Sequence, residues 1–406
     1  MRLVCCPSAT DVVYCGICVD AGTRHEQPGE EGIAHFVEHL SFKGTERRRS
    51  WHIINRMEAV GGDLNAFTGK DATFYHCSVL RDHFARALDL LLDIVLHSTY
   101  PQHEMDKEVE VVCDEIESYN DTPSELIFDE FENIIFRNTP LGHSILGEAK
   151  LLRQLKSDDV RRFTQRLYRP ERMVLFVMGN VPPQRIIRLT EGFFRKYPLA
   201  PTSALTTGQS SSRQVLSDAL QPTAPRFFEV RKQTNQAHVM MGCEAFGSSD
   251  PRSLALRLLN NMLGGPGMNS RFNLALRERC GLVYTVESNY TAYTDTGLWT
   301  VYFGCDPHDV ERCRRLVMKE LRRLTDAPLS AAQLAAAKRQ FIGQIGLSYD
   351  SFESVAIGMA RRYLHHGTTI TPEQRYEQIE ALTSELLHQV AQALFLPEKL
   401  TTLVYR

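Results

Sequence analysis

The sequence has no long hydrophobic run and no large excess of one charge. No stretch approaches 18 consecutive apolar residues, so we expect a soluble protein that does not span a membrane. The formal net charge is −3, and acidic and basic residues are mixed along the chain. This pattern gives no electrostatic signal for nucleic acid or anionic lipid as a partner. The short basic run Arg47 to Arg49 is interpreted as a solvated loop.

A secretory signal and a disulfide pattern are also missing. The first residues lack a long apolar core and a small-residue cleavage site, so we expect a first strand there and a cytoplasmic protein. Ten cysteines in a chain of 406 residues are interpreted as reduced thiols. Cys15 and Cys18 have the spacing of a redox pair, but a strand would direct them to opposite faces. No second pair of this kind exists to form a structural zinc site.

The motif with the clearest chemical meaning is His35-x-x-Glu38-His39, in which two histidines four residues apart enclose a glutamate. Neutral imidazoles one helical turn apart can both bind one Zn²⁺, and the glutamate can deprotonate a water at the remaining coordination position. This order is the inverse of the more common His-Glu-x-x-His. The motif favours a metal-dependent hydrolase. The alternative is a surface helix that carries two of the chain's 14 histidines.

The flanking residues predict that the motif lies on a helix over residues 30–42. Glu30 and Glu31 suit the positive start of a helix, and Gly44 suits its end. At about 100° per residue, the apolar side chains fall on one face and the motif residues on the opposite face. Helix packing and metal binding therefore do not compete for the same side.

A catalytic zinc with two histidine ligands often takes a carboxylate as its third protein ligand. Residues 102–118 have apolar side chains at helical spacing, and Glu108 and Glu115 lie on one edge of that stripe. A carboxylate at such a boundary is partly desolvated and needs a cation or a donor as its partner. Either glutamate is therefore a candidate ligand. The alternative is an acidic helix whose boundary glutamates pair with arginines.

Three segments together carry a family resemblance: HFVEHLSFKGT, EVEVVCDEIESYNDTPSEL and PLGHSILG. They resemble the inverted-motif zinc metallopeptidases of the pitrilysin, insulinase and mitochondrial-processing-peptidase type. In that family the third zinc ligand is a glutamate 76 residues after the second histidine, which is Glu115 here. The resemblance implies Zn²⁺ as the cofactor. It also gives Glu108, seven residues earlier, a supporting catalytic role near the metal.

The resemblance also implies residues that hold the substrate. LRERCGLVY is similar to a family pair in which an arginine and a tyrosine, here Arg277 and Tyr284, donate to the substrate backbone. The alternative is that Arg277 meets helix-end carbonyls and Tyr284 is a core strand residue. GGDLNAFT resembles the edge strand that binds substrate, which makes Asn65, Ala66 and Phe67 substrate contacts. Without the resemblance, its two glycines predict only a turn before a strand.

The chain looks internally duplicated. Strand-like and helical segments of the first half have counterparts in the second half at an offset near 229 residues. We therefore expect an α+β fold of two homologous α/β domains, each a mixed or antiparallel sheet covered by helices. The boundaries are 1–196 for the zinc-binding half, 197–222 for a linker and 223–406 for the half without metal. In the second copy, Gln344 aligns with Glu115 and Ala337 with Glu108, so the second copy lacks the metal ligands.

These features predict a zinc metalloendopeptidase that hydrolyses short unfolded peptides, with Glu38 as the general base. The resemblance implies a homodimer in which the second half of one chain faces the zinc half of the other. The alternative is a non-catalytic or partner-dependent subunit of a processing-peptidase-like complex. The retained ligand set argues against a non-catalytic subunit.

Overall fold

The computed structural model describes residues 1–199, 226–232 and 234–406, and in that part of the chain the elements build two five-stranded sheets. The chain divides into two compact units, each with one sheet. The first contains the described residues of 1–118, 139–199 and 348–369, and the second those of 119–138, 226–347 and 370–406.

The sheet of the first unit is mixed. Its strands lie in the order β1-β5-β2-β4-β3, with β1 parallel to β5 and the other pairs antiparallel. The strands are β1 (Arg2–Pro7), β2 (Val12–Val19), β3 (Asp63–Thr68), β4 (Thr73–Leu80) and β5 (Met173–Gly179). All seven residues of β5 are buried, as expected for a central strand covered on both faces. In contrast, β3 forms one edge of the sheet.

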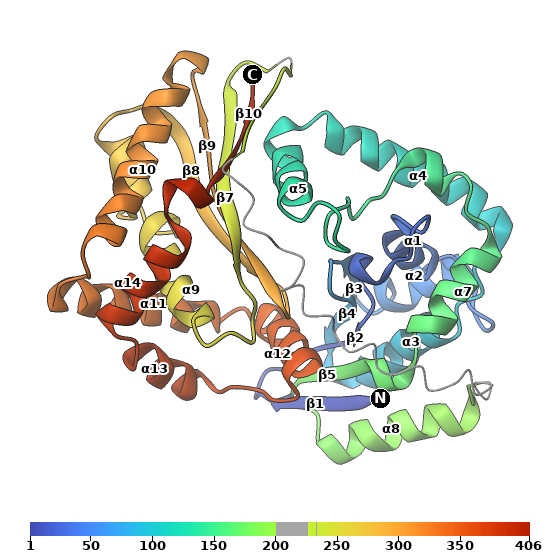
Figure 1. Cartoon of the computed structure of the whole chain (residues 1–406). Helices are drawn as coiled ribbons and strands as arrows, with labels where there is room; N and C mark the ends of the chain where they lie inside the picture. Colours follow the sequence, from blue (N-terminus) through green and yellow to red (C-terminus); the bar gives the residue numbers. More distant parts are fainter. Residues whose placement is uncertain (200–225, 233) are drawn as a thin grey trace. The chain divides into compact units, whose positions relative to one another are not determined.

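Helices from the first half of the sequence cover one face of this sheet (Figure 1). Their apolar stripes share one core with the inward side chains of β2 and β4, and α3 is the most completely buried of them. They are α1 (Ile33–Leu40), α2 (Ser50–Glu58), α3 (Phe84–Leu96), α4 (Gln102–Asn120), α6 (Ala149–Leu152), α7 (Ser157–Leu167) and α8 (Pro183–Lys196).

The sheet of the second unit repeats the first strand for strand. Its order is β6-β10-β7-β9-β8, and β6 is again parallel to β10 while the other pairs are antiparallel. The strands are β6 (Phe227–Val230), β7 (Ala237–Phe246), β8 (Val283–Ala292), β9 (Thr296–Cys305) and β10 (Thr401–Tyr405). The helices are α9 (Ser253–Gly264), α10 (Val310–Asp326), α11 (Ala331–Ser348), α13 (Pro372–Glu380) and α14 (Ser384–Leu394), with the π-helical turn η5 (Asn273–Glu278). The predicted fold of two homologous mixed-sheet domains is confirmed.

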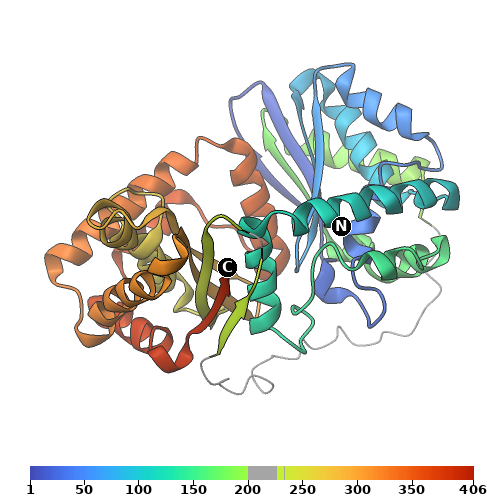
Figure 2. The same cartoon turned by 90° about the horizontal axis from the view of Figure 1, so that it is seen from above.

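Two helices are exchanged between the halves of the sequence. Helix α12 (Phe352–His366) follows the second-half helices but packs on the first sheet, where Ala356, Ala360 and Leu364 join the apolar cluster of β4 and β5. Helix α5 (Pro123–Ile135) comes from the first half and packs on β7 and β10 (Figure 2). The compact units therefore differ from the two halves of the sequence.

All ten cysteines are free, and Cys15 and Cys18 lie in the clusters on opposite faces of the first sheet, as predicted. The predicted linker lies outside the described residues from residue 200 onward. No helix in the described ranges is long and apolar enough to cross a membrane.

The interpretation of Arg47 to Arg49 as a solvated loop holds for the exposed Arg49 and is wrong for Arg47 and Arg48. Arg47 and Arg48 both form ion pairs with Asp89 and with the fully buried Asp93 on α3. Arg47 also lies over the ring of Tyr197, with its Cζ 3.8 Å from the ring centroid. A carboxylate as buried as Asp93 needs such cations, so Arg47 and Arg48 have a structural role.

Candidate metal centre

The motif helix α1 is shorter than predicted. It begins after Gly32, which has a φ of +94°, because the N–H of Ile33 bonds to the carbonyl of Glu30 and closes a turn over residues 30–32. It ends at Leu40, followed by Ser41, whose hydroxyl donates to the carbonyl of Val37. The whole of α1 except His39 is buried, so the motif residues lie inside the unit rather than on an exposed face.

The three predicted ligands lie together. Glu115 on α4 places its Oε2 3.9 Å from Nε2 of His35 and 3.5 Å from Nε2 of His39. All three donor atoms lie within 4.8 Å of one another. Donors that share one ion at about 2 Å each lie roughly 3–4 Å apart, so this spacing suits a single bound metal. Two imidazoles and one carboxylate are a typical donor set for catalytic zinc.

The charge state of His35 suits a ligand. Burial, helped by the nearby His39, lowers the pKa of His35 to about 3. Its imidazole is therefore neutral at physiological pH, which is the form that binds a metal.

Glu108 orients His39. Its carboxylate is almost fully buried and lies 3.0 Å from Nδ1 of His39 and 2.5 Å from Nζ of Lys43. Burial acts to raise the pKa of Glu108, but the hydrogen bonds from His39 and Lys43 outweigh it and hold that pKa below its usual value. An ionised Glu108 accepts the proton of Nδ1 and leaves Nε2 of His39 free to face Glu115 and His35.

Glu38 lies beside the cluster in a setting suited to a base. Its carboxylate is buried, and the hydroxyl of Thr68 at the end of β3 donates to it. Burial raises the pKa of Glu38, while the hydrogen bond from Thr68 acts in the opposite direction. A carboxylate with a raised pKa accepts a proton more readily than one in water.

The predicted substrate strand lies where main-chain pairing is possible. Asn65, Ala66 and Phe67 belong to β3, which within the described part of the chain pairs only with β4. The side chain of Asn65 is exposed, whereas the ring of Phe67 stacks on Phe74 with centroids 4.8 Å apart.

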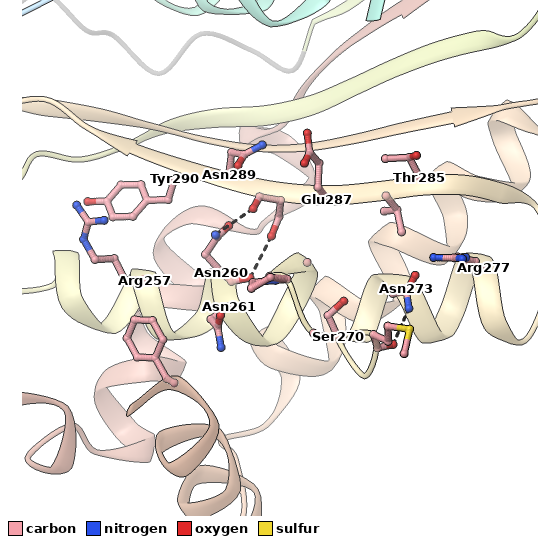
Figure 3. A pocket seen from close by; sticks show the side chains of 18 of the residues that line it. Arg257, Asn260, Asn261, Ser270, Asn273, Arg277, Thr285, Glu287, Asn289 and Tyr290 are labelled. Carbon is pink, nitrogen blue, oxygen red and sulfur yellow. Dashed lines mark hydrogen bonds between the residues drawn. The ribbon is translucent and has the colours of Figure 1, made fainter. Parts of the chain in front are cut away.

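Arg277 and Tyr284 lie in the second unit. Arg277 is on the π-helical turn η5, and its Cζ lies 5.5 Å from the ring centroid of Tyr284 on β8. Tyr284 is 84% exposed, so the alternative that it is a core residue is wrong. Both line a pocket of about 620 Å³ between β8, α9 and the loop that follows α9, with Arg257, Asn260 and other polar side chains (Figure 3).

This pocket lies where the repeated topology puts the counterpart of the metal cluster. In chain order α9 corresponds to α1, β8 to β3 and α11 to α4. The only metal-type cluster of histidine, cysteine and acidic side chains among the described residues is nevertheless the one in the first unit. The second unit thus keeps the architecture and lacks the metal ligands.

Sequence reasoning missed Lys43 and Thr68. Lys43 is part of the segment that carries the family resemblance, and Thr68 directly follows the predicted substrate residues, but neither contact is local in the sequence.

The expected roles of Glu30 and Glu31 at the helix start are also wrong. Glu30 pairs with Arg166 and Glu31 accepts from the N–H of Gly29, whereas the carboxylate at the start of α1 is that of Glu26.

Together, the repeated fold and the cluster of three metal-type donors define a duplicated α+β protein with a candidate metal centre in one unit. The chain belongs to the insulinase family, peptidase family M16. Residues 4–149 match the family model described as Insulinase (Peptidase family M16), and residues 154–341 match the model described as Peptidase M16 inactive domain.

Individual relatives agree with this assignment. The Bacillus subtilis protein named uncharacterized zinc protease YmxG is 31% identical over 94% of this chain and 90% of its own length. A Streptomyces coelicolor protein, also named as an uncharacterized zinc protease, is 30% identical over 95% of this chain and 83% of its own. A solved protease from Helicobacter pylori has the same fold, with a TM-score of 0.90 at 22% identity over 100% of this chain and 96% of that chain.

Proposed function

We propose that this chain is a zinc-dependent endopeptidase that hydrolyses peptide bonds of short unfolded peptides. The observation that carries the proposal is the grouping of His35, His39 and Glu115 around one point, with the buried carboxylate of Glu38 beside it. The family and the names of the relatives, which include the words zinc protease, support it.

The residues of the cluster fit Zn²⁺, and each has a part in the chemistry. When bound by His35, His39 and Glu115, Zn²⁺ supplies a Lewis acid that polarises the scissile carbonyl and makes water easier to deprotonate. Glu38 takes a proton from the attacking water and passes it to the leaving amine. Glu108 and Lys43 keep the imidazole of His39 in the orientation that binding requires.

Substrate binding is proposed on two surfaces. An extended peptide pairs with β3 at Asn65, Ala66 and Phe67, because an edge strand offers main-chain groups without regard to the peptide's side chains. Arg277 and Tyr284 donate to the peptide beside the scissile bond, where a cation and a phenol stabilise developing negative charge.

We further propose that the enzyme is a cytoplasmic homodimer. The homodimer follows from the family resemblance, because one chain carries both the zinc motif and the arginine–tyrosine pair. The ten free cysteines support a reducing compartment. The rival proposal is a subunit that is inactive alone and needs a related chain as its partner.

The test is cleavage of a mixed library of short unstructured peptides by the purified protein, with zinc content measured on the same sample. We expect cleavage that a chelator stops and that is lost in Glu38→Gln, while this variant keeps its zinc. Glu117→Gln, the same chemical change at an exposed position of α4, is the matched control and should retain activity. Cleavage by zinc-loaded Glu38→Gln would contradict the assignment, and bound zinc without any cleavage would favour the rival.

A further inference from the structure

The start of helix α1 determines where the metal ligands point. His35 is only the third residue of the helix, so its backbone lies in the first turn. The first N–H groups of any helix have no partner inside the helix and need one elsewhere. The N-cap residue is Gly32, which has no side chain to accept from these N–H groups. The backbone position of His35 therefore depends on whatever holds this first turn.

Glu26 holds the first turn. One oxygen of its carboxylate accepts from the N–H of Ala34 at 2.8 Å, and the other accepts from the N–H of Gly32 at 3.1 Å. The side chain of Glu26 is only 1% exposed. A buried carboxylate at the positive end of a helix both satisfies the backbone donors and favours the helix electrostatically. Ala34, bonded in this way, directly precedes His35 in the chain.

His143 holds Glu26. Its Nε2 lies 2.8 Å from the carboxylate oxygen that also accepts from Gly32, and the imidazole donates to that oxygen when Glu26 is ionised. His143 belongs to the PLGHSILG segment, which carries part of the family resemblance but has no part in the proposed catalysis. The bond links a loop more than a hundred residues away in sequence to the motif helix.

That loop is itself fixed against the motif helix. The ammonium group of Lys70, which is buried, donates to the carbonyls of Leu141 and His143. Gly147 has a φ of +72°, and a Cβ placed on it would lie 2.6 Å from Cα of Gly32. The loop therefore touches the chain at the N-cap of α1 backbone to backbone.

His35 lacks the kind of hydrogen bond that orients His39. In most metal sites the ring nitrogen of histidine that does not bind the metal is held by a carboxylate, carbonyl or water. Glu108 does this for His39, but Nδ1 of His35 is buried and has no hydrogen-bond partner among the described residues. The imidazole of His35 is thus directed by its backbone and by packing.

We infer that Glu26 and His143 are positioning residues for the metal centre, acting through the first turn of α1 on His35. The inference rests on the proposed metal site and adds to it a second support that mirrors the Glu108–His39 contact. Its consequence is that metal affinity depends on a hydrogen-bond donor at position 143, which lies outside the ligand set.

The test compares three variants by the dissociation constant for Zn²⁺, measured in competition with a chromophoric chelator. The amide nitrogen of Gln can replace Nε2 of histidine, whereas Asn is too short to reach Glu26. We expect His143→Asn to weaken zinc binding roughly tenfold, the lower end of what such supporting contacts contribute, and His143→Gln to remain near wild type. His388→Ala, which removes a half-buried histidine with one hydrogen bond in the second unit, should have no effect.

Activity and folding provide the second readout. In His143→Asn, kcat should fall with KM unchanged, and the thermal midpoint of the metal-free protein should match that of His143→Gln. Equal zinc affinity in the Asn and Gln variants, or an equal loss in His388→Ala, would overturn the inference. A wild-type chain that binds no zinc would instead overturn the proposed function, so the two failures are distinguishable.

Discussion

At the residue scale, burial and a few hydrogen bonds set the charge of each group at the centre. Burial keeps His35 neutral and raises the pKa of Glu38, which favours a ligand in one case and a base in the other. Glu108 is as buried as these two, but His39 and Lys43 keep it ionised. Two glutamates of one small region thus differ because Glu108 contacts the ammonium group of Lys43, whereas Glu38 accepts from a neutral hydroxyl.

The contact between Thr68 and Glu38 should influence the pH at which activity is lost, because it lowers the pKa of Glu38. A base works only when deprotonated, so activity is present above the pKa of Glu38 and is lost as the pH falls through it. The hydroxyl of Thr68 favours the ionised form, so Thr68→Ala should raise this pKa further and move the acid limb of kcat/KM to higher pH. Thr68→Ser should leave the limb in place. An acid limb at the same pH in Thr68→Ala would show that this hydrogen bond does not affect the pKa of Glu38.

The contact between Glu108 and His39 should support metal binding. Glu108→Gln keeps the size of the side chain but removes the charge that holds Nδ1–H of His39 and the ammonium of Lys43. We expect zinc affinity to fall about 10- to 100-fold, as for other partners of metal-bound histidines. Equilibrium dialysis with radioactive zinc measures this change. The control is Glu110→Gln, since Glu110 lies on the same helix but pairs with the exposed Arg153; a similar loss in both variants would argue against a specific role.

Single residues were predictable where the chemistry is local in sequence. Two histidines and a glutamate within five residues are recognisable as a metal-binding motif, and Glu115 was predicted from the family spacing. Lys43 and Thr68 were missed because their partners, Glu108 and Glu38, reach them only when other elements fold against them. The prediction failed for Arg47 and Arg48 for the same reason, since their partners lie on α3 more than 40 residues away.

At the element scale, the exchange of α5 and α12 is the main feature that sequence patterns could not give. Each is an ordinary helix with an apolar stripe, and such a stripe does not specify which of two similar sheets it will cover. The repeated topology was accessible because matching strands and helices recur at nearly constant spacing. The sequence pattern therefore predicted the two sheets, but it did not predict which helices pack on each of them.

The exchange predicts which unit depends on α12. Leu364 lies in the apolar cluster on the first sheet and is 7% exposed, so Leu364→Ala should lower the free energy of unfolding by about 2 kcal/mol. Hydrogen exchange should increase in β1, β2 and β5 while β7 and β9 keep their protection. Leu347→Ala, the same change at an exposed helical position, should be neutral. Faster exchange in β7 and β9 instead would mean that α12 stabilises the other sheet.

At the scale of the whole molecule, one fold appears twice, and among the residues that the structure describes only the first copy carries a cluster of metal-type ligands. The counterpart of Glu115 is Gln344, and the counterpart region in the second unit is a polar pocket that contains Arg277 and Tyr284. In the proposed function this architecture, without the ligands, provides substrate contacts, which is the division of labour that the proposed dimer requires.

A mixing experiment tests that division of labour. If the second half of one chain serves the zinc half of the other, Glu38→Gln and Arg277→Ala chains, each inactive alone, should form mixed dimers with one complete site. Random exchange of subunits then restores roughly a quarter of the wild-type activity. Sedimentation on the same samples shows whether dimers form. Dimers that mix without any recovery would contradict assembly of the site from two chains.

The most direct measurement of the central claim is a crystal structure of the zinc-loaded protein with anomalous data collected on both sides of the zinc absorption edge. We expect one zinc peak per chain, at about 2 Å from Nε2 of His35, Nε2 of His39 and a carboxylate oxygen of Glu115. A chain without a peak at this cluster, or with its zinc bound elsewhere, would contradict the assignment of these residues as the metal centre.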